Sequence, residues 1–410
     1  MLLPFQILGI WFRALLSVAI LVGGIWLLKR WYDHREIVVS RRPSEIIQEK
    51  PIDSLDGERV DIRAEVTETI EWQFGWNKET AWLLGGAALL LWSVGGGFSW
   101  TSLLRRSGEG APKTSRGSGE VHWIKRRDGT ELYVEIHGAP NGIPLVLTHG
   151  WGLDIDEWFY AKERNKRYRL FVWDLPGLGE SKSPRTKDWS LEKLADDLDA
   201  VINLAGNRQV FLVGHSIGGM ITLTYCRLFA STLIRQVAGV IVVHSTYTNP
   251  CRTAKHSGLY SAIQKPILEP LCWLMIALAP LFWLMNWMSY LNGSAHRSTS
   301  RTSFSGNESR DQLGFMTRYY VWAWPSVVAR GFLAMFRYDA TRALQSIKVP
   351  ALIVSADRDE LCTPAASEHM AQSIPSATLA VIQDARHCGL FERHERFAQL
   401  IDEFTQRHAP

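Results

Sequence analysis

The sequence is poor in the residues that build covalent or metal frameworks. It has five cysteines in 410 residues, an odd number, and none of them forms a C-x-x-C pair or the paired spacing of a zinc site. The cysteines are Cys226, Cys251, Cys272, Cys362 and Cys388. We expect small apolar packing residues at these positions, with a functional thiol at Cys362 or Cys388 as the alternative.

The sequence also lacks a strong excess of one charge. Its net charge is +4, and the basic residues are scattered or sit beside apolar runs instead of forming one long stripe. This pattern gives nucleic-acid binding little support. Hydrophobic residues make up 46% and charged residues 21% of the chain, which is ordinary for a globular protein. The apolar residues are nevertheless concentrated in a few blocks.

Two of these blocks are long enough to span a bilayer. Residues 7–28 are apolar except for Arg13, and residues 81–104 carry no charge, so each reaches the roughly 20 residues that a membrane helix needs. The first block has no basic start and no cleavage site, and it ends in Lys29 and Arg30, which argues against a signal peptide. We predict a membrane anchor over residues 1–106 with a polar connecting segment over 29–80, and buried soluble helices are the alternative.

Residues 59–72 of that segment alternate polar and apolar side chains, which favours a short strand or two outside the membrane. A flexible linker rich in glycine, serine and basic residues is predicted over 107–119. The second domain is expected over 120–410. Basic residues follow both apolar blocks, so the positive-inside rule does not fix the orientation, and the cytoplasmic side is only preferred for this domain.

Strand and helix patterns alternate from residue 120 onward. Short apolar, β-branched runs predict strands at 132–136, 144–148, 170–173, 210–213, 240–243, 351–355 and 378–382, and amphipathic patterns predict helices at 191–204 and 217–229. Such alternation predicts an α/β fold, a mostly parallel sheet with helices on both faces. Ligands bind at the carboxyl ends of the strands of such sheets.

A nucleophile motif follows one of these strands. The run Gly214-His215-Ser216-Ile217-Gly218 lies between the strand VFLV and a helix pattern, which is the context of a strained turn that presents a serine. A structural turn serine is the alternative. We expect Ser216 to be the nucleophile.

A serine hydroxyl needs a positioned base, and the base needs an orienting carboxylate. Asp359 follows the strand ALIVSA and His387 follows the strand TLAVIQ, so both are expected at the carboxyl-end loops near Ser216. Asp357, which is closer to its strand end, is the competing acid. The order serine, acid, histidine is that of a nucleophile-elbow enzyme.

Backbone N–H groups should stabilise the oxyanion that forms during attack. Ile217, which follows the nucleophile, is one expected donor. Trp151, in the loop His149-Gly150-Trp151-Gly152 after the strand PLVLT, is the other. A tight turn that only packs the tryptophan is the alternative at that loop.

Taken together, these motifs resemble the α/β-hydrolase superfamily, in its serine esterase, lipase and cofactor-free peroxidase branch. The matching runs are HGWG at 149–152, DLPGLGES at 174–181, GHSIGG at 214–219, ADRD at 356–359 and ARH at 385–387. The resemblance implies a triad of Ser216, Asp359 and His387 with no metal or organic cofactor. It also implies a structural role for Asp174. Epoxide hydrolases and dehalogenases carry an aspartate at the position of Ser216, so the resemblance argues against their chemistry.

The insertion between two predicted strands, about residues 248–339, is expected to form a helical lid. Its run 270–291 is uncharged and carries Trp273, Trp283 and Trp287. A single membrane crossing here would place Ser216 and His387 on opposite sides of the bilayer. Pro280 interrupts the run, so two short helices with an apolar face are the better interpretation.

The sequence therefore predicts a membrane-anchored serine hydrolase that cleaves a carboxylic ester, apolar or lipid-like, through an acyl-enzyme. The expected partners are that ester and the lipid bilayer. Two alternatives remain at this stage. One is a cofactor-free peroxidase or carbon–carbon bond hydrolase that uses the same triad, and the other is a non-catalytic membrane scaffold.

Overall fold

The computed structural model describes residues 3–34, 38–43, 66–71, 78–104, 112–163 and 167–409. The chain divides into two compact units. One comprises Ala19–Ser93, and the other comprises Met1–Val18 together with Val94–Pro410. Each unit is described by itself.

The larger unit is built on an eight-stranded sheet with the order β10-β9-β8-β7-β5-β6-β4-β3. The strands are β3 (Glu120–Lys125), β4 (Glu131–Gly138), β5 (Ile143–Thr148), β6 (Tyr168–Trp173), β7 (Val210–His215), β8 (Val237–Val243), β9 (Ala351–Ala356) and β10 (Ala377–Ile382). Pairing is parallel from β10 to β6, whereas β4 runs antiparallel to β6 and β3 antiparallel to β4. All seven predicted strands are confirmed, and β3 is an additional strand.

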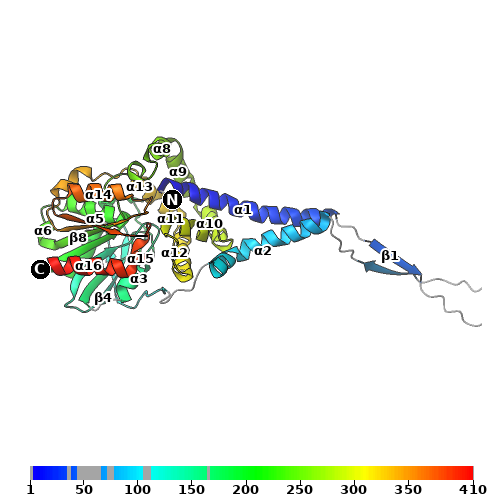
Figure 1. The fold of residues 1–410 in the computed structure, drawn as a ribbon, viewed down its shortest axis with the longest axis horizontal. Coiled ribbons are helices and arrows are strands. Elements are labelled where there is room, and N and C mark those ends of the chain that lie inside the picture. The colour runs from blue at the N-terminus through cyan, green and yellow to red at the C-terminus, as the bar shows by residue number, and fades with distance from the viewer. Residues whose placement is uncertain are drawn as a thin grey trace, which may run out of the picture. The chain divides into compact units, whose positions relative to one another are not determined.

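Helices cover both faces of this sheet (Figure 1). They are α3 (Phe159–Glu163), α4 (Leu191–Ile202), α5 (Ile217–Leu228), α6 (Leu233–Gln236), α14 (Pro364–Ser373), α15 (Gly389–Glu392) and α16 (His394–His408), with 3-10 turns η1 (Ile155–Trp158), η3 (Asn203–Ala205) and η5 (Thr341–Ser346). Alternate strand residues point to opposite faces. Leu212 and Val242 therefore join the core under α4, α5 and α14, and Val213 and Val243 join the core under α16.

A helical insertion lies between β8 and β9. Its elements are α7 (Pro250–Thr253), α8 (Ser257–Ile263), η4 (Gln264–Leu268), α9 (Glu269–Ala277), α10 (Ala279–Leu291), α11 (Ser294–Ser303), α12 (Arg310–Trp322) and α13 (Pro325–Met335). Thr248 pairs with Asp339 in an isolated bridge, so the two ends of the insertion meet at its base. The chain bends by 98° between the helical run ending at Ala277 and α10, because Pro280 is accepted only in the first turn of a new helix. The predicted break is confirmed.

The segment before β3 is held by a buried cluster of acids. Arg116 forms ion pairs with Asp154 at 2.6 Å and with Asp174 at 2.9 Å, and Thr114 donates to Asp156 at 2.7 Å. The predicted linker is therefore anchored from Thr114 onward. Residues 107–111, its first part, lie outside the described residues.

The smaller unit contains parts of two long apolar helices, α1 (Leu3–His34) and α2 (Lys78–Leu104), and a ribbon of β1 (Val38–Pro43) and β2 (Val66–Glu71). Ile7–His34 and Lys78–Ser99 each contain an 18-residue window of high mean hydropathy, 2.0 and 1.5 respectively, and are long and apolar enough to span a membrane. A Cβ on Gly24 would lie 3.3 Å from the carbonyl oxygen of Gly86, so glycines let the two backbones approach closely, as in membrane helix pairs. β2 falls within the predicted 59–72 region, whose residues 59–65 and 72 lie outside the described residues.

The first residues of α1 and the last residues of α2 belong to the larger unit and pack against the insertion. The rings of Trp11 and Phe282 lie 4.4 Å apart edge to face, and Asn292 donates to the Ser17 hydroxyl at 2.8 Å. A Cβ on Gly97 would lie 2.4 Å from the Tyr290 carbonyl oxygen, so glycine is required where α2 meets α10.

Candidate active site

Ser216 occupies a sharp turn between β7 and α5. Its φ is +54°, a left-handed conformation that costs a non-glycine residue about 1–3 kcal/mol and is seen at functional sites. Neighbouring glycines make the turn possible, since a Cβ on Gly218 would lie 2.3 Å from the Thr148 carbonyl oxygen and one on Gly214 would lie 2.2 Å from that of Gly218. The motif therefore has the predicted strand, turn, helix context.

The three side chains predicted to act together form a chain of contacts at hydrogen-bonding distance. Nε2 of His387 lies 3.0 Å from Oγ of Ser216, and Nδ1 of His387 lies 2.8 Å from Oδ2 of Asp359. The other carboxylate oxygen, Oδ1 of Asp359, accepts from the N–H of Leu361 at 2.7 Å and of Cys362 at 3.1 Å. The structure thus brings Ser216, His387 and Asp359 together.

Asp359 is favoured in its charged form although it is buried. Burial alone raises the pKa of a carboxyl group, but the charge of His387, its hydrogen bond and the backbone N–H of Cys362 outweigh burial and lower the pKa of Asp359. The competing acid, Asp357, forms no hydrogen bond or ion pair with His387 and instead accepts from the N–H of Ala385 at 3.0 Å. The geometry therefore favours Asp359 as the acid.

Both residues expected to supply the oxyanion donors lie near the serine, Ile217 as its neighbour in the chain and Trp151 across the cavity. The N–H of Ile217 is the first of α5 and has no acceptor within the helix. Trp151 lines the same cavity as Ser216, and its ring is held by a hydrogen bond from Nε1 to the Val328 carbonyl at 2.9 Å. Gly331 leaves room for this ring, because a Cβ there would lie 2.0 Å from it.

A second buried network, which the sequence reading missed, supports the loops. Oε1 of Glu157 lies 2.5 Å from Nδ1 of His215, and Oε2 of Glu157 accepts from the N–H of Gly150 at 2.8 Å. His215 Nε2 and His244 Nδ1 both donate to the carbonyl oxygen of His387, each at 3.0 Å. Glu157 thereby connects the oxyanion loop with the backbone of the candidate base.

The pKa values of His215 and His244 are shifted in opposite directions. Burial opposes the charged form of His215, but the nearby Glu157 carboxylate outweighs it and raises the pKa of His215. Burial lowers the pKa of His244 to about 3, so His244 is neutral. Glu157 follows the HGWG run by only a few residues, and His215 is inside the G-x-S-x-G motif. No sequence motif, however, indicates that these two side chains are in contact.

The cysteines near the site favour the thiol form. Burial raises the pKa of Cys362 and of Cys388, and Cys388 Sγ lies 3.6 Å from the hydroxyl of Tyr320. Asp359, Cys362 and His387 bring three possible metal ligands within 4.8 Å of one another. His387, however, already directs both ring nitrogens to Asp359 and Ser216, so this group fits proton transfer better than metal binding.

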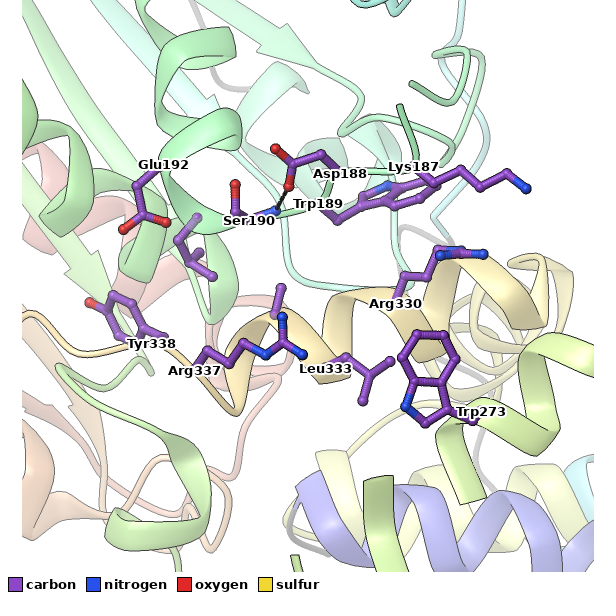
Figure 2. Close-up of a pocket in the computed structure, with 12 residues that line it drawn as sticks. Lys187, Asp188, Trp189, Ser190, Glu192, Trp273, Arg330, Leu333, Arg337 and Tyr338 are labelled. Atoms are coloured by element: carbon purple, nitrogen blue, oxygen red, sulfur yellow. Dashed lines mark hydrogen bonds between the residues drawn. The ribbon is translucent and has the colours of Figure 1, made fainter. Parts of the chain in front are cut away.

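The cavity at Ser216 is small, about 20 Å³, and is lined by both sheet loops and insertion residues such as Tyr320 and Met335. A larger cavity of about 260 Å³ lies beside it along α13, between the loop before α4 and the insertion (Figure 2). Figure 2 shows Arg330, Arg337 and Trp273 facing Asp188 and Trp189 across this space. Because Met335 borders the first cavity and Leu333 the second, α13 forms a wall between them.

Comparison with known proteins agrees with this architecture. Residues 145–400 match the Alpha/beta hydrolase family. The AB hydrolase superfamily protein YisY of Bacillus subtilis is 24% identical over 301 residues, covering 69% of this chain and 98% of the relative. A pimeloyl-acyl-carrier-protein methyl ester esterase of Yersinia pseudotuberculosis is 28% identical over 272 residues, covering 64% and 93%.

Among solved structures, an esterase from Exiguobacterium antarcticum superposes with a TM-score of 0.57 at 21% identity, covering 70% of this chain and all of that chain. At this identity the likeness shows the fold. The family match spans more than half of the chain, so the predicted fold class and the resemblance are both confirmed. The chain belongs to the alpha/beta hydrolase family, as an enzyme with esterases among its relatives.

Proposed function

We propose that the protein is a membrane-anchored serine hydrolase that cleaves apolar or lipid-like carboxylic esters through an acyl-enzyme. The observation that carries this proposal is the chain of contacts from Ser216 Oγ through His387 to Asp359, at 3.0 and 2.8 Å. These distances suit a base that removes the serine proton and a carboxylate that orients the imidazole and stabilises its charged form.

The chemistry takes place in two halves. In the first, His387 Nε2 accepts the Ser216 proton while Oγ bonds to the ester carbonyl carbon, and the N–H groups of Ile217 and Trp151 stabilise the oxyanion. The alcohol leaves with a proton from His387. In the second, His387 accepts a proton from water as the water oxygen bonds to the acyl carbon. The bond from that carbon to Ser216 Oγ then breaks, His387 returns the proton to Oγ, and the carboxylic acid is released.

Several exposed side chains of the insertion support an apolar, membrane-derived substrate. Trp273, Leu281, Leu284 and Trp322 are each about half exposed. Water-exposed apolar area costs roughly 25 cal/mol per Å² relative to lipid. Tryptophan favours the membrane interface because it combines an apolar ring with an N–H. The insertion is thus suited to contact a bilayer to which two apolar helices would tether the enzyme.

The proposal is tested by covalent labelling and by turnover of the detergent-solubilised full-length protein. A fluorophosphonate probe should label Ser216, and Ser216→Ala should remove the label. A panel of esters of graded acyl chain should be cleaved with a preference for long over short chains. A protein that is neither labelled nor active on any ester would be a scaffold, and labelling without a chain-length preference would contradict the apolar substrate.

A further inference from the structure

A third cavity adjoins the candidate active site on the side of α1. It measures about 60 Å³ and is bordered by Arg13 of α1, by hydroxyl-bearing residues of α11 and by Trp151 and Gly152 of the oxyanion loop. All of these residues belong to the larger unit. The cavity therefore combines one cationic side chain, several hydroxyl groups and the loop expected to hold the scissile carbonyl.

Arg13 has no ion pair and no side-chain hydrogen bond within the described part of the chain, and its Nε is shielded from solvent without a partner. Arg13 is only partly exposed. Its guanidinium is permanently charged, and a charge partly withdrawn from water without a counter-ion is unfavourable. Neighbours on α1 are apolar, so the helix itself supplies no compensating acid. An ionisable residue in such a setting points to a functional partner.

The part of the cavity wall formed by α11 is unusually polar for a buried helix. α11 has the sequence SAHRSTSRTS, and its Thr299, Thr302 and Ser303 are almost fully buried while they line the cavity. Thr302 and Ser303 lie 3.2 Å apart through their hydroxyl oxygens. Hydroxyl groups can donate hydrogen bonds to an anion that a guanidinium binds in a bidentate manner.

The position of this cavity connects it to catalysis. Trp151 and Tyr320 line both this cavity and the one that contains Ser216, and Gly152 follows the expected oxyanion donor directly. A substrate with its carbonyl at Trp151 and Ile217 could therefore extend past Trp151 toward Arg13. The charged end of such a substrate would serve as the counter-ion of Arg13.

We infer that Arg13 and the hydroxyl groups of α11 bind a phosphate or carboxylate carried by the substrate, so that the preferred substrate is an anionic amphiphilic ester. This inference rests on the ester hydrolysis proposed above, and it specifies the substrate class. Arg13 would act as a specificity-determining residue, because its charge distinguishes an anionic ester from a neutral one with the same acyl chain.

The test compares two esters that differ only in the anion, decanoyl glycerol phosphate and decanoyl glycerol, with full-length protein in neutral detergent. The wild type should favour the phosphate ester in kcat/KM. Arg13→Met should lower the ratio of the two kcat/KM values about tenfold or more, and Arg13→Lys should lower it less. The matched control is Arg301→Met, which removes the same charge from an exposed position on α11 and should keep the wild-type ratio.

Binding without turnover gives an independent measure. Dodecyl phosphate should bind the full-length protein at least tenfold more weakly after Arg13→Met, as followed by tryptophan fluorescence, whereas Arg301→Met should have no effect. Inorganic phosphate should not displace dodecyl phosphate at matched concentration. Equal displacement would make this a site for the free anion and would overturn the assignment to the substrate.

The anion site and the ester hydrolysis can be tested separately. If decanoyl glycerol is cleaved and Arg13→Met leaves the ratio and the binding unchanged, the inference is overturned and ester hydrolysis stands. If neither ester is cleaved and the fluorophosphonate does not label Ser216, the proposed function fails. Dependence of dodecyl phosphate binding on Arg13 would still support the anion site in that case.

Discussion

At the scale of single residues, the proposed roles make a graded set of predictions. Ser216→Ala and His387→Ala should each lower kcat on the order of 10⁵–10⁶-fold, and the double variant should be little worse than either, because the two residues act as one unit. Asp359→Asn should lower kcat on the order of 10⁴-fold by removing the group that orients His387. Steady-state kinetics on one ester measures all of them.

Asp357→Asn is the control for the acid, since Asp357 contacts the backbone of Ala385 and not the imidazole. It should change kcat by less than about tenfold. A steep loss in Asp357→Asn together with a mild loss in Asp359→Asn would reverse the assignment.

The buried pair of Glu157 and His215 gives a second prediction at the residue scale, with stability as the readout. Glu157→Gln leaves His215 without its counter-charge and should lower the free energy of unfolding by about 3–5 kcal/mol. Glu192→Gln, which disrupts the exposed pair with Arg227, is the control and should cost less than about 1 kcal/mol. Denaturant unfolding of the detergent-solubilised chain compares them.

The same pair has a defined pH dependence. The pKa of His215 is raised by Glu157, so its contribution is complete below the unfolded value of about 6.5 and is lost as pH rises through the folded value. The pKa of Glu157 is lowered overall, because His215 outweighs burial, so its contribution is present above about 4.3 and is lost as pH falls through the folded value. The stability gap between wild type and Glu157→Gln should therefore be widest near pH 5–6.5 and narrower at pH 9, and a gap that widens toward pH 9 would contradict the pairing.

At the scale of elements, sequence pattern predicts what is local and misses what is paired at long range. The parallel strands are recognisable because burial on both faces makes each a continuous apolar run. β3 is an edge strand beside β4. Its sequence EVHWIK mixes apolar residues with exposed charged ones, so in the sequence it resembles the polar segment before it. β1 has a similar polar composition, VVSRRP.

The candidate site divides in the same way. Ser216, Asp359 and His387 could be predicted because each lies in a turn or loop that follows a strand, and the carboxyl ends of these parallel strands meet at the same edge of the sheet. Glu157 and Arg13 could not, because Glu157 matters through its contact with His215 and Arg13 through the cavity that it lines together with α11, and both exist only after folding. The sequence of an apolar helix with one arginine is the same whether or not the arginine lines a cavity.

The insertion gives a prediction at the element scale. Trp283 and Trp287 partly face an aromatic cluster, with Trp287 packed against Trp322 and Tyr290, so changing them would disturb packing as well as any lipid contact. Leu281 and Leu284 are about half exposed and can be changed with less structural cost. The variant Leu281→Ser with Leu284→Ser should lower the rate on a long-chain ester in vesicles several-fold more than the rate on a soluble short-chain ester.

The control for that variant is Leu379→Ser, which removes a partly exposed leucine from the edge strand β10, outside the insertion. It should change both rates equally. An equal effect of the insertion variant on both esters would mean that these leucines serve packing and not the membrane.

At the scale of the whole molecule, two helices of sufficient length and hydropathy predict an integral membrane enzyme. Full-length protein should stay with membranes through alkaline carbonate extraction, because removing two apolar spans from lipid exposes a large apolar area to water. Both α1 and α2 contain glycines where their backbones lie close together, which supports a helix pair within the bilayer.

The informative comparison is a chain truncated before the acid cluster. It should begin at Pro112 and not at Glu120, because Arg116 joins Asp154 and Asp174 and its loss would leave buried carboxylates without their counter-charge, a change that costs several kcal/mol. The chain from Pro112 should leave the membrane on carbonate treatment and still react with a fluorophosphonate, whereas the chain from Glu120 should melt at a lower temperature. Release of the full-length protein by carbonate alone would show that α1 and α2 are not membrane spans, and equal melting temperatures of the two truncated chains would show that Arg116 does not stabilise the hydrolase unit.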